Sequence, residues 1–299
     1  MDKIPTAESI YEALDVIPTG LFIDNLTGIS GLPRGRMTVL TGQPSVGKST
    51  LSLIAIREAQ KLGLKPLLYD VEFSFDPNYA KNLGVDIKKL WVIQERFAED
   101  GLDRIEAALE TGEFGLVVVD SIGALLPRTE AEKNYGERTI GAQAGLVAKF
   151  VRKAIPIIAI KNIALICLTH EFQDIMSGTV KPSGGAKLVF HSSLTIQLKY
   201  KGVYLKSGDK KVGKVIHAVI KKNRLASTEG AEMSSNFVFG TGFSATSDLL
   251  QIAIDKNIIQ KRKTSYFFGE TKLGVGLQQA RKTLEGDEEL LTKIKEKLD

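Results

Sequence analysis

The chain has 299 residues, of which 43% are hydrophobic and 25% charged, so it can form one large domain or a large domain with a small second one. Its opening residues, MDKIPTAESI, lack the apolar core of a signal peptide, and no run approaches the ~18 apolar residues of a membrane span. A single cysteine, Cys167, excludes an internal disulfide, and we expect a cytoplasmic protein without a membrane partner.

The first two thirds of the chain alternate short apolar runs with helical stretches. Strands are predicted over residues 37–40, 66–73, 90–94, 116–120 and 164–170, and helices over 51–62, 101–110 and 137–161, the last interrupted at Pro156. The strands are apolar throughout rather than alternating, which is typical of a parallel sheet covered by helices on both faces. Cys167 and Trp91 lie within such runs, so both are expected in the core.

The pattern changes after residue 192. Strands over 193–200, 214–222 and 234–240 look antiparallel, and the first two lie in an unusually basic part of the chain. Residues 199–224 hold nine Lys or Arg and one acid, a net +8, whereas the whole chain is +5, so the remainder sums to −3. Such a basic block indicates a polyanionic partner, or else a solvated hairpin, and charge alone leaves the two readings open.

From residue 245 the chain is predicted to be helical again, ending in an amphipathic helix over 287–298. We therefore divide it into a short N-terminal segment of residues 1–16, an α/β core of residues 17–243 with a mostly parallel central sheet, and a small α-rich C-terminal domain of residues 244–299.

The stretch TGQPSVGKST follows the first predicted strand and precedes the first predicted helix. It fits the phosphate-binding pattern G-x-x-x-x-G-K-S, in which glycines let backbone N–H groups face an anion and the helix N-terminus adds its positive dipole. Lys48 is expected to reach the β- and γ-phosphates of ATP, and the Ser49 hydroxyl to bind Mg²⁺. The residues predicted around the phosphates are Gly42, Gln43, Pro44, Ser45, Val46, Gly47, Lys48, Ser49 and Thr50.

Polar residues that end neighbouring strands complete the predicted site. Asp120 ends the run LVVVD and is expected to hold the Mg²⁺ together with Ser49. Glu72, at the end of the second predicted strand, is placed to activate a water for attack on the γ-phosphate, although Asp70 competes for this role on spacing alone. His170 ends the run ALICLTH, either as a reporter of nucleotide state or as a structural residue.

The order of these motifs resembles the RecA recombinases, including their phage UvsX-type members. The motifs, in chain order, are GQPSVGKST, YDVEFSFDPNYAKNLGVD, LVVVDSIGAL, a polar strand end, a loop reaching Gly184 and Gly185, and IKKNRLA. The resemblance extends from about residue 17 to the end of the chain. The resemblance implies a RecA-type P-loop ATPase core with a small C-terminal domain. It also implies an ATP- and Mg²⁺-dependent strand-exchange protein that forms a helical filament on single-stranded DNA and hydrolyses ATP when DNA is bound.

The resemblance also implies roles for single residues. Glu72 matches the glutamate that activates water, and His170 matches the position that senses the γ-phosphate, where glutamine is commoner. Asp76 and Tyr79 match positions that hold the adenine. Lys222 and Arg224 match two basic residues that reach the ATP of the neighbouring subunit.

Two DNA-binding loops are implied over residues 133–140 and 171–183. Such loops would bind DNA through backbone amides and through apolar side chains, Ile175 or Met176, inserted between bases. The implied DNA-binding residues are Arg138, Ile140, Ile175, Met176, Lys181, Gly184 and Gly185. The implied partners are single-stranded DNA, homologous duplex DNA, further copies of the chain in a head-to-tail filament, and single-strand-binding or loader proteins.

Two alternative functions are compatible with the same core. A non-recombining regulatory ATPase or mediator would hydrolyse ATP without joining DNA molecules. A hexameric helicase motor would form closed rings and unwind a forked duplex. The order of the motifs favours the recombinase.

Overall fold

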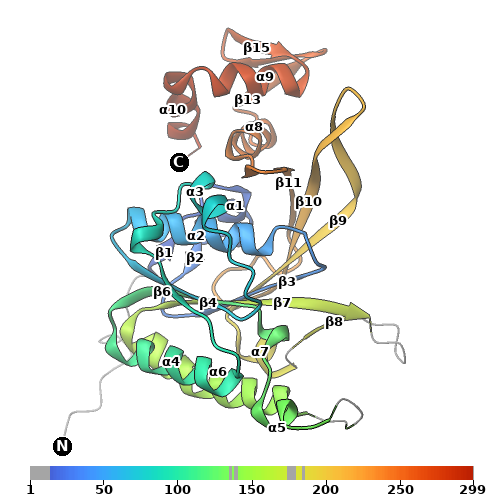
Figure 1. The fold of residues 1–299 in the computed structure, drawn as a ribbon. Helices are drawn as coiled ribbons and strands as arrows, with labels where there is room; N and C mark the ends of the chain where they lie inside the picture. Colours follow the sequence, from blue (N-terminus) through green and yellow to red (C-terminus); the bar gives the residue numbers. More distant parts are fainter. Residues whose placement is uncertain (1–13, 135–136, 138–140, 174–179, 184–185, 299) are drawn as a thin grey trace, which may run out of the picture.

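The computed structural model describes residues 14–134, 137, 141–173, 180–183 and 186–298, and its main feature is one large sheet (Figure 1). In the described residues this sheet has 10 strands in the order β12-β11-β10-β9-β3-β7-β6-β4-β5, with β8 paired to β7. The strands from β9 to β5 run parallel. They are β3 (Met37–Gly42), β4 (Lys65–Asp70), β5 (Trp91–Ile93), β6 (Phe114–Asp120), β7 (Ala164–Gln173) and β9 (Leu194–Ser207).

The remaining strands extend the sheet antiparallel on the side of β9. They are β10 (Lys210–Asn223), β11 (Glu232–Val238) and β12 (Gly242–Phe243), while β8 (Val180–Pro182) returns along β7. The basic block of the sequence is therefore the long hairpin of β9 and β10. The predicted mostly parallel sheet with an antiparallel region is confirmed.

Helices cover both faces of the sheet, so the apolar core forms two layers, one on each face of the sheet (Figure 1). One layer lies under α1 (Phe22–Thr27), α2 (Lys48–Lys61) and α3 (Pro77–Asn82), and the other under α4 (Ala98–Thr111), α6 (Ala142–Lys161) and α7 (Ala186–His191). Neighbouring residues of one strand enter opposite layers, as Leu40 and Val39 do. Both layers must be apolar, which is why these strands are continuously hydrophobic.

Short elements complete the core. They are β1 (Val16–Ile17) paired with β2 (Leu32–Pro33), α5 (Arg128–Ala131), and single 3₁₀ turns at Ile87–Lys89 and Ile122–Ala124. No helix in the described ranges is both long enough and apolar enough to cross a membrane.

Two expectations about the core are wrong. Helix α6 runs through Pro156 without interruption, because Val151, Ala154 and Ile158 form a buried stripe against the sheet. Burial of that stripe offsets the roughly 3 kcal/mol cost of an interior proline. Trp91 is 43% exposed, since β5 is the edge strand, and its ring packs edge-on against Phe114. Cys167 is buried as expected, and burial raises the pKa of its thiol to about 12.

The C-terminal domain contains more than helices. Between α8 (Ala245–Asp255) and α9 (Gly276–Glu285) lies a three-stranded antiparallel sheet of β13 (Ile259–Arg262), β14 (Ser265–Phe268) and β15 (Thr271–Val275), and α10 (Glu288–Glu296) follows. These elements enclose a small core of their own around Ile259, Leu273 and Leu284. The predicted return to helix missed this sheet, because its strands have only four or five residues each.

Candidate nucleotide-binding site

The loop between β3 and α2 has the backbone that an anion site requires. Gly42 and Gly47 have φ values of 149° and 91°. A Cβ on Gly42 would lie 2.2 Å from the Leu198 carbonyl oxygen, and one on Gly47 would lie 2.9 Å from the Phe243 ring. Only glycine fits at either position. The N-terminus of α2 has no side-chain cap, so its N–H groups are available to a phosphate.

Lys48 lies at the mouth of this loop and is buried. Its Nζ donates to the carbonyl oxygens of Gly42 at 2.9 Å and Gln43 at 2.8 Å, and lies 3.3 Å from Nδ1 of His170. Burial lowers the pKa of Lys48, and the negative charges of Asp120, Glu72 and Glu171 oppose that shift. The backbone therefore holds the ammonium group where the loop closes around an anion.

Ser49 and Asp120 bring a hydroxyl and a carboxylate together at the carboxyl ends of the strands. Burial raises the pKa of Asp120 to about 6, and a hydrogen bond from Ser49 opposes that shift. Both side chains line a cavity of about 90 Å³. Hard oxygen donors beside a phosphate loop suit Mg²⁺, so this pair fits the metal that the sequence predicts.

Glu72 is part of a hydrogen-bonded group next to Lys48. Its Oε1 accepts from Ser121 Oγ at 2.5 Å and lies 3.0 Å from His170 Nε2. Burial raises the pKa of Glu72, but the hydrogen bonds of Ser121 and His170 and the charge of Lys48 outweigh burial and lower it. The His170 ring thus bridges the phosphate-loop lysine and the candidate catalytic carboxylate.

The environment of Asp70 differs from that of Glu72. This difference bears on which of the two acids is the general base, a question that the sequence left open. It is buried, and its carboxylate accepts from the backbone N–H groups of Ser74 and Phe75 and from Nε2 of Gln94. Three donors hold it in the fold of the loop after β4. This geometry favours Glu72 for the role of general base.

Asp76 and Tyr79 lie on the same cavity as Ser49 and Asp120. Asp76 caps α3 by accepting from the N–H groups of Asn78 and Tyr79, and Tyr79 Oη lies 2.9 Å from Thr50 Oγ1. The short helix α3 was not predicted, although its Asp-Pro start is a capping signal.

Two family models together match nearly the whole chain. The model of the RecA N-terminal domain matches residues 4–244, and that of the RecA C-terminal domain matches residues 247–299. The chain belongs to the RecA family.

Curated RecA proteins are similar to it over nearly the whole of this chain and more than four fifths of their own length. The Protein RecA of Ureaplasma parvum is 36% identical over 293 residues, which cover 96% of this chain and 86% of the relative. That of Thermus aquaticus is 36% identical over 289 residues, covering 95% and 85%. That of Aquifex aeolicus is 35% identical over 289 residues, covering 95% and 83%.

Two residues that the RecA resemblance assigns to ATP do not reach the phosphate loop of their own chain. Lys222 pairs across β10 and β9 with Thr195, which lies beside Val39, three residues before the loop begins. Its Nζ donates to the carbonyl oxygens of Val189 and Phe190 at the end of α7, as Arg224 does to Phe190. These cations therefore lie at a separate edge of the RecA core.

The implied DNA-binding residues of this RecA-family chain fall largely outside the described residues. These are Arg138, Ile140, Ile175, Met176, Gly184 and Gly185. Lys181 lies on β8, where its backbone pairs with Phe172 of β7. Strand β7 therefore runs from His170 directly into the second implied DNA loop.

One contact of the phosphate loop was not predicted. Lys214 on β10 donates from Nζ to the Ser45 carbonyl oxygen at 2.5 Å, and Ser45 has the left-handed φ of 60°. The same ammonium group lies 5.7 Å from the Tyr200 ring centroid and 5.9 Å from that of Phe237. The antiparallel extension thus supports the loop from outside. Only the register of β10 brings Lys214 there, so no local pattern could have revealed it.

We expect Lys214→Gln to weaken ATP binding about threefold to tenfold with little change in kcat, because a charged donor that holds the loop contributes on the order of 1 kcal/mol. Lys214→Arg should retain most of the affinity. Lys211→Gln is the matched control, since Lys211 lies over the Tyr204 ring on the same strand. Calorimetric titration with a non-hydrolysable ATP analogue measures the effect, and an equal loss in both Gln variants would contradict this role.

Proposed function

We propose that the chain is an ATP-dependent strand-exchange protein that polymerises on single-stranded DNA and pairs it with homologous duplex. The observation that carries this proposal is the full-length RecA match together with a complete constellation of Lys48, Ser49, Glu72, Asp120 and His170. In this proposal a single chain both hydrolyses ATP and binds DNA, because the bound nucleotide controls its affinity for DNA.

The residues suggest how ATP is hydrolysed. The loop and Lys48 bind the phosphates, and Ser49 and Asp120 hold Mg²⁺, which neutralises phosphate charge when bound. Glu72 orients and deprotonates the attacking water, and its lowered pKa keeps it ionised for that role. His170 contacts both Glu72 and Lys48, so a γ-phosphate bound beside Lys48 would change the position of the His170 ring. The movement would pass along β7 into the second DNA loop.

The position of Lys222 and Arg224 supports a nucleotide shared between subunits. Both lie away from their own phosphate loop, at the end of β10. In a head-to-tail polymer they would reach the ATP of the neighbouring copy, and cations there offset charge that develops on the γ-phosphate. Such a contact does not close on itself, so it builds an open helix.

We expect Lys222→Ala to reduce ATP-dependent filament assembly strongly while leaving the ATP affinity of the isolated monomer within about twofold. Lys222→Arg should assemble better than Lys222→Ala, because the cation is retained. Light scattering measures assembly, and nucleotide titration below the assembly concentration measures monomer affinity. An equal loss of monomer affinity would show that the contact is made within one chain.

DNA affinity should fall with salt. Each neutralised phosphate of a single strand contributes about −0.7 to the slope of log K against log salt concentration. Fluorescence anisotropy with a labelled oligonucleotide, across a salt series and with saturating ATP analogue, measures the slope. A slope near zero would contradict phosphate contacts.

The deciding experiment is ATP hydrolysis with and without single-stranded DNA, with negative-stain imaging of the same mixtures. DNA-stimulated turnover with helical filaments supports the recombinase, and joint molecules formed from homologous circular and linear DNA would complete the case. Closed rings that unwind a forked duplex would indicate the helicase motor. Turnover with filaments but without joint molecules would indicate the regulatory ATPase.

We further propose a cytoplasmic location, with single-strand-binding or loader proteins as partners. We also propose functional boundaries at residues 16 and 243, with residues 244–299 as a separate module. The buried core around Ile259, Leu273 and Leu284 supports the last of these boundaries.

A further inference from the structure

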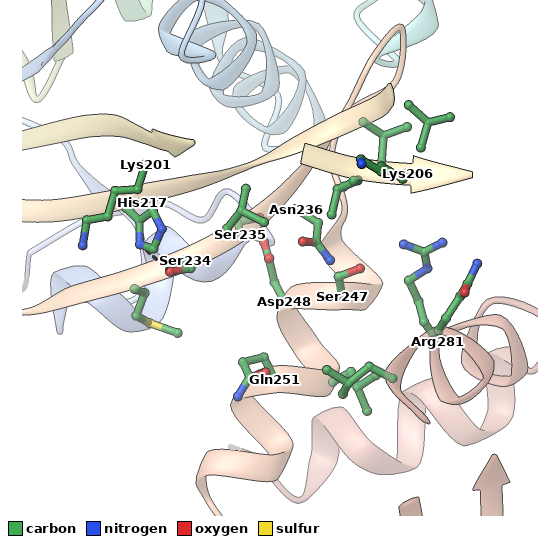
Figure 2. A pocket seen from close by; sticks show the side chains of 18 of the residues that line it. Lys201, Lys206, His217, Ser234, Ser235, Asn236, Ser247, Asp248, Gln251 and Arg281 are labelled. Atoms are coloured by element: carbon green, nitrogen blue, oxygen red, sulfur yellow. Dashed lines mark hydrogen bonds between the residues drawn. The ribbon is translucent and has the colours of Figure 1, made fainter. Parts of the chain in front are cut away.

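A large cleft lies where the antiparallel extension meets the C-terminal domain, and it shares no lining residue with the nucleotide cavity described above. Its volume is about 940 Å³, at the upper end of the range for sites that take small organic ligands. One wall is formed by β9, β10 and β11, and the other by α8 and α9 (Figure 2).

Buried polar atoms without hydrogen bonds line this cleft. Asp248 is 2% exposed and Ser235 is 3% exposed, yet within the described part of the chain Asp248 Oδ1 and Ser235 Oγ have no hydrogen-bond partner of ordinary geometry. Burial raises the pKa of Asp248 to about 7, and the nearby Ser235 hydroxyl opposes that shift although the two side chains lack ordinary hydrogen-bond geometry. The other oxygen, Asp248 Oδ2, accepts from the Phe22 N–H at 3.1 Å. Asp248 Oδ1 is therefore a buried acceptor that has no hydrogen-bond donor among the described residues.

The cleft also has a cationic end. Lys206 from β9 and Arg281 from α9 lie on facing walls there (Figure 2), and Lys282 lines the same cleft. Arg281 Nε lies 3.3 Å from Glu285 Oε1 without hydrogen-bond geometry. Among the described residues neither Lys206 nor Lys282 forms an ion pair. This end is electrostatically suited to a phosphate group.

At the opposite end of the cleft, the polar side chains already contact one another. His217 Nδ1 lies 2.7 Å from Ser234 Oγ, and Lys201 lies 3.9 Å from Glu232. Between the two ends, Asn236 and Ser247 add polar groups (Figure 2), and Leu205, Val212 and Leu277 add apolar surface. A ligand here needs an anion at one end, N–H or O–H donors for Asp248 in the middle, and a flat or apolar part against the leucines.

We propose that this cleft binds a nucleotide, with its phosphate between Lys206 and Arg281 and its sugar or base donating to Asp248 Oδ1. A nucleotide combines the three required features in one molecule of suitable size, whereas an inorganic anion offers no donor or apolar surface. This nucleotide is additional to the ATP of the phosphate loop.

Binding would have a mechanical effect. The cleft walls belong to the core and to the C-terminal domain, so an occupant that contacts Lys206 and Arg281 bridges the two. Occupancy would fix the orientation of the C-terminal domain against β9 and β10, the most basic part of the core.

The test uses the full chain with Lys48→Ala, which removes the phosphate-loop site, and AMP as the probe in calorimetric titration. We expect one AMP per chain. Adding Arg281→Gln should weaken binding about tenfold or more, since hydrogen bonds to charged groups have this size. Asp248→Asn should weaken it severalfold and can still accept from Phe22. Lys293→Gln is the matched control, because Lys293 lies on α10 in an exposed pair with Glu289 and outside the cleft.

Two further titrants distinguish the source of the ligand. Inorganic phosphate should bind at least tenfold more weakly than AMP. A short oligodeoxyadenylate that displaces AMP only when Arg281 is present would show that the natural nucleotide is a unit of a DNA strand, and failure to displace it would assign a free nucleotide. The proposal is overturned if AMP does not bind, if phosphate binds as tightly as AMP, or if Arg281→Gln and Lys293→Gln behave alike.

Discussion

Lys48→Ala should lower ATP affinity at least about a hundredfold and abolish DNA-dependent hydrolysis and filament assembly. The ammonium group lies in a buried position between the Gly42 and Gln43 carbonyl oxygens, and two or more hydrogen bonds to charged phosphates are worth about 1.5–3 kcal/mol each. Titration with a non-hydrolysable analogue, steady-state ATPase assays and imaging measure the three losses.

The fold should survive this substitution. Burial lowers the pKa of Lys48, so the desolvation of its charge partly offsets the two hydrogen bonds that Ala would lose, and the thermal midpoint should change little. Lys61→Ala is the control at the other end of α2, where an exposed pair with Glu58 contributes little. Retention of tight ATP binding by Lys48→Ala would exclude the loop as the nucleotide site.

Glu72→Gln should lower kcat about 10²- to 10⁴-fold, the usual contribution of a general base, while ATP affinity changes less than about threefold. Glutamine has the same shape and its amide oxygen can still accept from Ser121 and His170, so the loop should keep its arrangement. Filaments formed with ATP should consequently persist. Single-turnover hydrolysis and filament lifetime after dilution are the readouts.

Asp70→Asn provides the internal comparison. Because Asp70 accepts three hydrogen bonds that shape the loop after β4, its substitution should lower the thermal midpoint and affect turnover only through folding. A slow but stable Asp70→Asn variant, beside an active Glu72→Gln variant, would reverse the assignment of the two acids.

The sequence signals that predict the phosphate site are local. The glycines of the loop, Lys48 and Ser49 lie in one short stretch of the chain. Asp120 ends β6 and His170 ends the apolar part of β7, and the topology brings both to one edge of the sheet. Parallel strands order their carboxyl ends together, so a strand-end residue is placed by pattern alone.

What the sequence missed depends on contacts between distant segments. Lys214 reaches Ser45 across 169 residues, and Asp248 reaches Phe22 across 226. Pro156 and Trp91 were misjudged for a related reason, since tertiary burial overrode a local helix breaker and an edge position exposed an apolar residue. The short strands of the C-terminal domain carried too little periodicity to be recognised.

Strand β10 carries a lysine near each end: Lys214 contacts the phosphate loop of its own chain, and Lys222, eight residues later, contacts the end of α7. An extended segment of that length spans about 26 Å, and it is stiffened by pairing with β9 along its length and with β11 as far as Val219. In a polymer in which Lys222 contacts the ATP of the next copy, each β10 strand would connect two adjacent ATP molecules mechanically. Hydrolysis along the polymer would then spread from neighbour to neighbour, as a wave with a direction, rather than occur at random positions.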